Sequence, residues 1–123
     1  MVVEIICCIF MKKICIVEKD KILRDYFSNY YKKRFVVSFV SLEEIKKVFT
    51  ESFSSYNKFI VDISGIDNYV DLCSELFGKY LVDRKLIFLV GKEQKKKLQN
   101  LGLKTDRMVS PESVNDLELF LTV

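Results

Sequence analysis

The sequence predicts an α/β fold in which helices cover both faces of a five-stranded parallel sheet. Short apolar segments without polar alternation, which are typical of strands buried on both faces, alternate five times with segments of helical periodicity. The chain has 123 residues, and 50% of them are hydrophobic. One domain with a sizeable core fits this length, and a second domain of ordinary size does not. We therefore expect a single three-layer α/β/α sandwich.

The predicted strands are short and rich in β-branched and aromatic residues, which favour extended backbone. They are residues 14–17, 35–40, 59–61, 86–90 and 107–109. Each is too short to be a helix of ordinary length. Parallel strands need long crossover connections, and the predicted helices between the strands supply them.

Helix start and stop signals accompany most of the predicted helices. The first helix begins after Asp20 as N-cap. Its apolar positions, which we expect to share one buried face, are Ile22, Leu23, Tyr26, Phe27 and Tyr30. The second helix begins at Ser41, and Glu44 has the spacing of a capping box. The others are predicted over 69–77, over 93–101 and from Ser110–Pro111 onwards.

Composition excludes several function classes. The net charge is +3 and the basic clusters at 32–34 and 95–97 are short, so we expect no nucleic-acid interface. The chain contains no histidine, which excludes histidine-dependent triads, histidine metal ligands and a histidine phosphocarrier. Its cysteines, at 7, 8, 15 and 73, match no zinc pattern. Cys15 and Cys73 lie in apolar patterns typical of buried thiols in a reduced, cytoplasmic protein.

Residues 1–11 are set apart from the rest of the chain. Residues 2–10 are apolar except for Glu4, and this segment is too short to span a membrane. Lys12 and Lys13 follow the apolar residues, whereas a signal peptide carries its positive charge before them. We therefore predict no membrane segment. Residues 1–11 are interpreted as an N-terminal extension, either an over-extended start or a loosely packed extra segment, and residues 12–123 as the domain.

The residues that follow the predicted strands are the candidates for a binding site. In an open parallel sheet, ligands bind outside the carboxyl ends of the strands, where the strand order reverses. Two carboxylates, Glu18 and Asp62, should face each other there across neighbouring strands. Their repulsion would be relieved by Mg²⁺ or by the ammonium group of Lys19. The four glycines are scattered, so the sequence contains no glycine-rich phosphate loop.

Taken together, these strand ends resemble those of response-regulator receiver domains over about residues 12–123. Residues 14–24 are similar to the family's first strand and helix, and residues 59–62 to its third strand, whose last residue is the phosphoacceptor aspartate. Residues 87–91 and 109–111 resemble the ends of the fourth and fifth strands. The resemblance implies a flavodoxin-like sheet in order 2-1-3-4-5, with two helices on one face and three on the other. It also implies a role in two-component signal transduction.

The sequence departs from the family's pattern at four positions. Lys19 replaces a metal-binding carboxylate, Val90 replaces a hydroxyl, Arg107 replaces the switch aromatic and Ser110 replaces a lysine. A single lost donor to a transition-state oxyanion costs about 3–4 kcal/mol, so these losses should impair phosphotransfer. The resemblance therefore implies a pseudo-receiver that is not an enzyme. Its acidic pocket would comprise Glu18, Lys19, Asp20, Asp62 and Ser64, with Asp62 at the phosphoacceptor position.

Three functions stay open at this stage. In the first, Lys19 holds Glu18 and Asp62 in a fixed state, and the domain binds a signalling protein, which is a histidine kinase or a downstream effector. By family resemblance, the contact surface, which could also form a homodimer, would comprise Lys95–Lys97, Arg107 and Ser113–Leu121. In the second, Asp62 accepts phosphate from a histidine kinase in a phosphorelay, with weak Mg²⁺ binding by Glu18 and Asp62 and no other cofactor. The third is an α/β enzyme or small-ligand binder unrelated to signalling.

Overall fold

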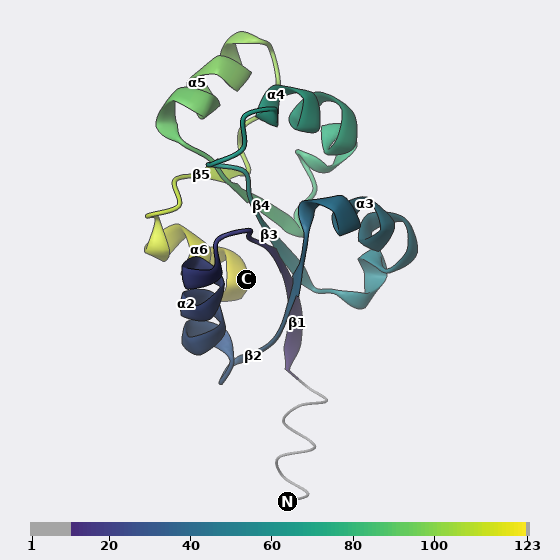
Figure 1. The fold of residues 1–123 in the computed structure, drawn as a ribbon, viewed down its shortest axis with the longest axis vertical. Coiled ribbons are helices and arrows are strands. Elements are labelled where there is room, and N and C mark those ends of the chain that lie inside the picture. The colour runs from purple at the N-terminus through teal and green to yellow at the C-terminus, as the bar shows by residue number, and fades with distance from the viewer. Residues whose placement is uncertain (1–10, 123) are drawn as a thin grey trace, which may run out of the picture. The chain divides into compact units, whose positions relative to one another are not determined.

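The computed structural model describes residues 11–122, which form five strands and five α-helices (Figure 1). The strands make one parallel sheet in order β2-β1-β3-β4-β5, so the predicted α/β sandwich and strand order are confirmed. The chain divides into two compact units, one up to Phe59 and one from Ile60, and each is described by itself. Within residues 11–122, no helix is long and apolar enough to cross a membrane. The predicted extension lies, except for Met11, outside the described residues.

The first unit is built on two parallel strands. Its elements are β1 (Lys12–Val17), α2 (Lys21–Tyr31), β2 (Phe35–Val40), α3 (Leu42–Glu51) and the 3-10 turn η1 (Phe53–Ser55). Lys12 pairs with Phe35 and Val17 with Val40, in an unbroken register. Helices α2 and α3 lie on opposite sides of this strand pair (Figure 1).

Two predicted caps begin the helices of this unit. The Asp20 Oδ1 atom accepts hydrogen bonds from the backbone N–H groups of Ile22 (2.8 Å) and Leu23 (3.2 Å). The Ser41 Oγ atom accepts from the N–H of Glu44 at 3.2 Å, and the Ser41 N–H donates to Glu44 Oε1 at 3.0 Å. The N-cap and the capping box are therefore confirmed. These hydrogen bonds with Ser41 also lower the pKa of the Glu44 carboxyl group.

Helix α2 buries a different face from the predicted one. Its buried side chains are Phe27 and Tyr31, which stack with ring centroids 6.2 Å apart. Tyr31 in turn contacts the ring of Phe35 edge-on at 5.9 Å. The predicted core positions that are instead exposed are Ile22, Leu23, Tyr26 and Tyr30. The prediction is confirmed for Phe27 and was wrong for the other four positions, because apolar residues cover more than one side of this helix and the contact with Phe35 selects the buried side.

The second unit contains the remaining helices and most of the sheet. Its elements are β3 (Lys58–Asp62, which begins in the first unit), α4 (Tyr69–Asp71), the π-helical turn η2 (Leu72–Leu76), the 3-10 turn η3 (Gly78–Tyr80), β4 (Leu86–Leu89), α5 (Lys92–Asn100), β5 (Met108–Val109) and α6 (Val114–Thr122). Helix α5 ends as predicted, because Gly102 adopts the left-handed conformation (φ 83°) that follows many helices.

Two predicted helices of this unit differ in the structure. The predicted helix over 69–77 is one α-helical turn followed by a π-helical turn. The last helix begins at Val114 rather than at Ser110–Pro111. There, the Ser110 Oγ atom accepts the N–H of Glu112 and the Ser110 carbonyl accepts the N–H of Ser113. This local turn provides acceptors for the N–H groups of Glu112 and Ser113, so the helix begins only after it.

The capping box gives a first test of the fold. We expect Ser41→Ala to lower the free energy of unfolding by about 1 kcal/mol, because the N–H of Glu44 loses its acceptor. Urea denaturation of both proteins measures this difference. Ser54→Ala, at an exposed position of the same unit, is the control and should change stability by less than about 0.5 kcal/mol. Equal losses in the two variants would contradict the role of the cap.

Cys15 and Cys73 are fully buried, as predicted, and give a second test. Burial raises the pKa of Cys15 to about 12, with a smaller contribution from the charge of Glu44, and raises the pKa of Cys73 to about 11. The unfolded thiols ionise near their ordinary pKa of 9.0. The unfolded state is therefore increasingly favoured as the pH rises above 9, by about 1.4 kcal/mol per pH unit for each thiol.

We expect the free energy of unfolding to be independent of these thiols below pH 9 and to fall between pH 9 and 11. Denaturant titrations at pH 8, 9, 10 and 11 under reducing conditions measure this change. Comparison with Cys15→Ala isolates one thiol from the other groups that titrate in this range. If the free energy of unfolding falls equally with pH in the wild type and in the variant, the predicted contribution of the Cys15 thiol is contradicted.

Candidate functional site

Asp62, at the carboxyl end of β3, is the centre of the predicted site. Its side chain is 9% exposed. The Asp62 Oδ1 atom accepts two hydrogen bonds from Ser64, one from the backbone N–H at 2.9 Å and one from Oγ at 2.6 Å. This arrangement is an Asx-type turn, in which an aspartate satisfies the backbone two residues later. The structure thus brings together Asp62 and Ser64, two members of the predicted acidic pocket.

The other predicted members belong to the first unit, at the end of β1. Glu18 is buried, and its Oε2 atom accepts a hydrogen bond from the N–H of Asp20 at 3.3 Å. The Asp20 side chain is engaged in capping α2. The predicted ion pair of Lys19 with Glu18 would lie within the first unit, and that of Lys19 with Asp62 would join the two units. Both stay predictions.

A magnesium site needs several oxygen ligands around one position. In the second unit, Asp62 offers one carboxylate, and one of its oxygens already accepts two hydrogen bonds. Among residues 11–122, no group of three or more acidic, cysteine or histidine side chains is placed to hold a metal ion. The described residues of the second unit do not by themselves fit a magnesium site. The predicted binding of Mg²⁺ by Glu18 and Asp62 stays a prediction.

Val90 and Ser110, for which the resemblance predicted the loss of a hydroxyl and a lysine, directly follow β4 and β5. Val90 is buried, and its N–H donates to the carbonyl of Val109 at 2.9 Å. Ser110 is occupied by its own turn, because its Oγ atom accepts the N–H of Glu112 at 3.3 Å. Both residues therefore have structural roles in the second unit.

Arg107 is held in place by the start of β4. Its Nε atom donates to the carbonyl of Leu86 at 3.1 Å, and Nη2 donates to the carbonyl of Arg84 at 3.0 Å. The guanidinium carbon lies 5.6 Å from the ring centroid of Phe120, within the range of a cation–π interaction. These contacts place the guanidinium group between the carbonyls that precede and begin β4 and the ring of Phe120.

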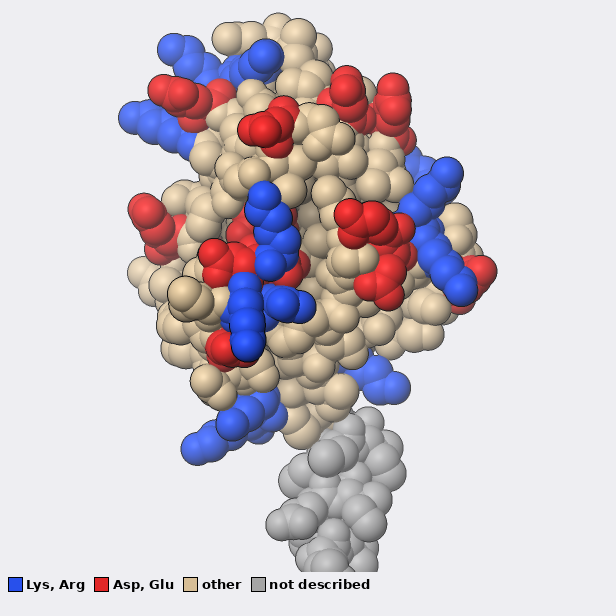
Figure 2. Space-filling model, viewed as in Figure 1, with Lys and Arg blue, Asp and Glu red and all other residues tan. Residues whose placement is uncertain are grey.

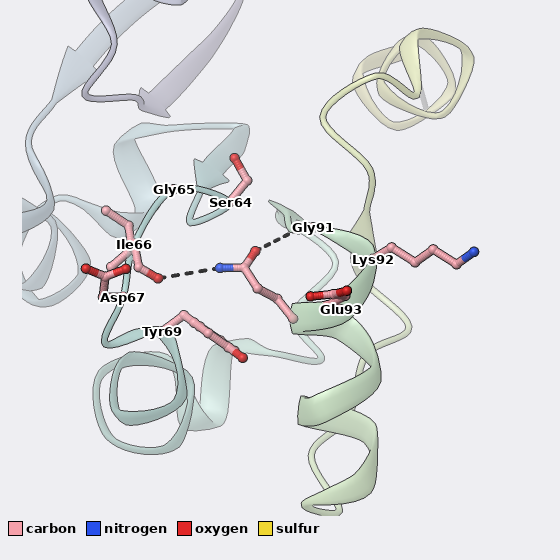
Figure 3. A pocket seen from close by; sticks show the side chains of 9 residues that line it. Ser64, Gly65, Ile66, Asp67, Tyr69, Gly91, Lys92 and Glu93 are labelled. Carbon is pink, nitrogen blue, oxygen red and sulfur yellow. Dashed lines mark hydrogen bonds between the residues drawn. The ribbon is translucent and has the colours of Figure 1, made fainter.

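Gln94, in the first turn of α5, is the residue that the sequence analysis missed. Its Oε1 atom accepts the N–H of Gly91 at 2.7 Å, and its Nε2 atom donates to the carbonyls of Ile63 (3.0 Å) and Ile66 (3.5 Å). The amide therefore joins the loop after β3 to the start of α5 (Figure 3). The signal available in the sequence was a glutamine three residues after Gly91, where its side chain can accept the N–H of the residue before the helix.

A cavity of about 430 Å³ lies beside this amide, between the loop after β3 and the start of α5. Its lining residues are Ser64, Gly65, Ile66, Asp67, Tyr69, Gly91, Lys92, Glu93 and Gln94. The lining carries two acidic side chains, Asp67 and Glu93, while Lys92 extends away from the cavity (Figure 3). The balance of charge does not favour a phosphate-bearing ligand.

The charged residues of the surface do not form a large basic or acidic area on the face drawn in Figure 2. Lysine and arginine side chains are interspersed there with aspartate and glutamate. The predicted contact surface includes Lys95, whose Nζ atom donates to the carbonyl of Met108 at 3.1 Å. Lys95, one basic residue of the 95–97 cluster, therefore contacts the backbone of β5.

Comparison with known proteins finds no matching family model, no matching curated protein and no matching solved structure.

The bridging amide gives a test of the site. We expect Gln94→Ala to speed hydrogen exchange of the Gly91 amide by about tenfold or more, because this N–H loses its acceptor. The variant should also lose about 1–2 kcal/mol of stability, since the carbonyl of Ile63 loses its donor. NMR-detected exchange measures the first effect, and denaturation the second. Lys96→Ala, at an exposed position of the same helix, should leave the Gly91 exchange rate unchanged.

Proposed function

We propose that this chain is a degenerate receiver-type domain that acts in two-component signalling by binding a partner protein, with impaired phosphotransfer. The observation that supports the proposal most is the setting of Asp62. This carboxylate ends β3 in a sheet of order 2-1-3-4-5, and its Oδ1 atom is engaged by Ser64. In the same unit, the ends of β4 and β5 carry Val90 and Ser110.

Electrostatics explains why this setting favours binding over chemistry. A phosphoryl group in transfer carries several negative charges, and catalysis depends on positive groups fixed beside it. Val90 is apolar and buried, and the Ser110 Oγ atom accepts a backbone N–H. Arg107 and Lys95 both donate to backbone carbonyls. These side chains of the second unit stabilise the fold instead of a transferring phosphate.

The proposed partner is a cytoplasmic signalling protein, either a histidine kinase or a downstream effector. The proposed contact surface comprises Lys95–Lys97 on α5, Arg107 directly before β5, and Ser113–Leu121, of which all but Ser113 lie on α6. With Arg107 fixed by two carbonyls, this surface would keep one conformation. A domain of this kind would signal by its presence and concentration rather than by its phosphorylation state.

The alternative is a working receiver that accepts phosphate on Asp62. The observation in its favour is that the carboxylate is retained at the end of β3, at the reversal of strand order where such sheets bind ligands.

Phosphate uptake separates the two functions. We expect no gain of a phosphoryl group by mass spectrometry when the protein is incubated with Mg²⁺ and acetyl phosphate, because the stabilising cation and hydroxyl are replaced. A gain that disappears in Asp62→Asn would establish the alternative and refute the proposal.

A restored variant is the matched control for that experiment. Lys19→Asp, Val90→Thr and Ser110→Lys together return the carboxylate, hydroxyl and ammonium groups that the family uses. We expect this variant to gain acetyl-phosphate-dependent modification that Asp62→Asn abolishes. Failure of a folded restored variant to gain the modification would count against the receiver interpretation itself.

A further inference from the structure

Strand β2 is the end strand of the sheet, next to β1. Its six residues, Phe-Val-Val-Ser-Phe-Val, include no charged residue, proline or glycine. Its register with β1 is continuous from Phe35 to Val40, so no bulge interrupts it. Edge strands of natural sheets are normally protected by charges, proline or bulges, because their outer backbone groups can pair with another strand. Strand β2 has none of these protections.

The charges that flank β2 have opposite signs at its two ends. The residues before it are Lys32, Lys33 and Arg34, and the first charged residues after it are Glu43 and Glu44, which Lys46 and Lys47 follow one turn further along α3. Lys32 and Glu43 are both exposed. Within one chain they are separated by the length of the strand, which is about 20 Å at 3.3 Å per residue. Each end therefore presents a charge that the other end of the same chain cannot neutralise.

An antiparallel pair of two β2 strands would cover the unprotected edge of each strand and would bring the opposite charges at the strand ends together. If Phe35 of one copy lies opposite Val40 of the other, every strand position has an uncharged neighbour. The basic residues of each copy then lie near Glu43 of the other, once at each end of the pair. A parallel pair would instead bring the two basic ends together. Charge complementarity thus selects the antiparallel arrangement, which has the two-fold symmetry of most homodimers.

We propose that β2 is a self-association surface through which a second copy of this chain extends the sheet by antiparallel β2–β2 pairing. The backbone groups on the outer side of β2 supply the hydrogen bonds, and the charges flanking the strand fix the register. This surface is distinct from the one on α5, β5 and α6, and the inference is independent of the signalling function proposed above.

Sedimentation of the full chain over a range of concentrations tests the proposal. We expect a reversible dimer. Ser38→Lys should weaken dimerisation by at least about 30-fold, because it places two ammonium groups beside the two-fold axis. Ser38→Thr is the matched control and should leave the dimer intact. Circular dichroism spectra of both variants are compared with that of the wild type to check that the fold is retained. A monomer at all concentrations, or a dimer that survives Ser38→Lys, would overturn the proposal.

A charge exchange tests the register. Lys32→Glu should weaken the dimer by about tenfold, since each end of the pair then carries like charges. Adding Glu43→Lys in the same chain should restore wild-type dimerisation, whereas Lys97→Glu, a reversal elsewhere, should have no effect. Absence of rescue in the double variant would refute the antiparallel register. Phosphate uptake at Asp62 is measured separately, so the two proposals can fail independently.

Discussion

Burial of the central strands on both faces is the constraint on which the rest of the structure depends. Ile14, Cys15 and Ile16 are consecutive and fully buried, and so are residues 59–61. Successive side chains of a strand point to opposite faces, so this burial requires cover on both faces of the sheet. Polar side chains are thereby confined to the strand ends and the helix surfaces. The position of Asp62 at the end of β3 follows from this constraint.

At these ends, the polar groups of the second unit are satisfied mainly by short-range partners. Ser64 donates to Asp62, Gln94 joins two loops, and Arg107 donates to two carbonyls. Each contact joins a loop or side chain at the strand ends to a neighbouring segment of the same unit. A buried polar group left without a partner costs about 1–3 kcal/mol, so movement of these segments would be unfavourable. This physical setting agrees with a domain that offers one fixed binding surface.

The first unit has a different character, because apolar residues remain at its surface. Ile22 on α2 is 79% exposed, and β2 is an end strand of the sheet without charged residues. An end strand without charges, proline or a bulge is a surface on which another strand can pair. Self-association through β2 would cover the backbone of the edge strand. The resulting dimer would carry two copies of the α5–β5–α6 surface.

The sequence by itself determined the features that depend on neighbouring residues. The strand positions, the N-cap at Asp20, the capping box at Ser41 and the burial of Cys15 and Cys73 were all predicted, because each rests on local spacing or apolar patterning. The order of the strands was predicted as well, on the strength of the family resemblance, and the structure confirms it.

Only the tertiary structure decided the features that depend on residues distant in sequence. The buried side of α2 was selected by packing of Tyr31 on Phe35, which periodicity could not distinguish from the exposed side. The role of Gln94 follows from the hydrogen bond between its amide and the carbonyl of Ile63, which lies 31 residues earlier in the chain. Local patterns indicate where most helices and strands lie, whereas the partner of a side chain depends on which segments the folded chain brings together.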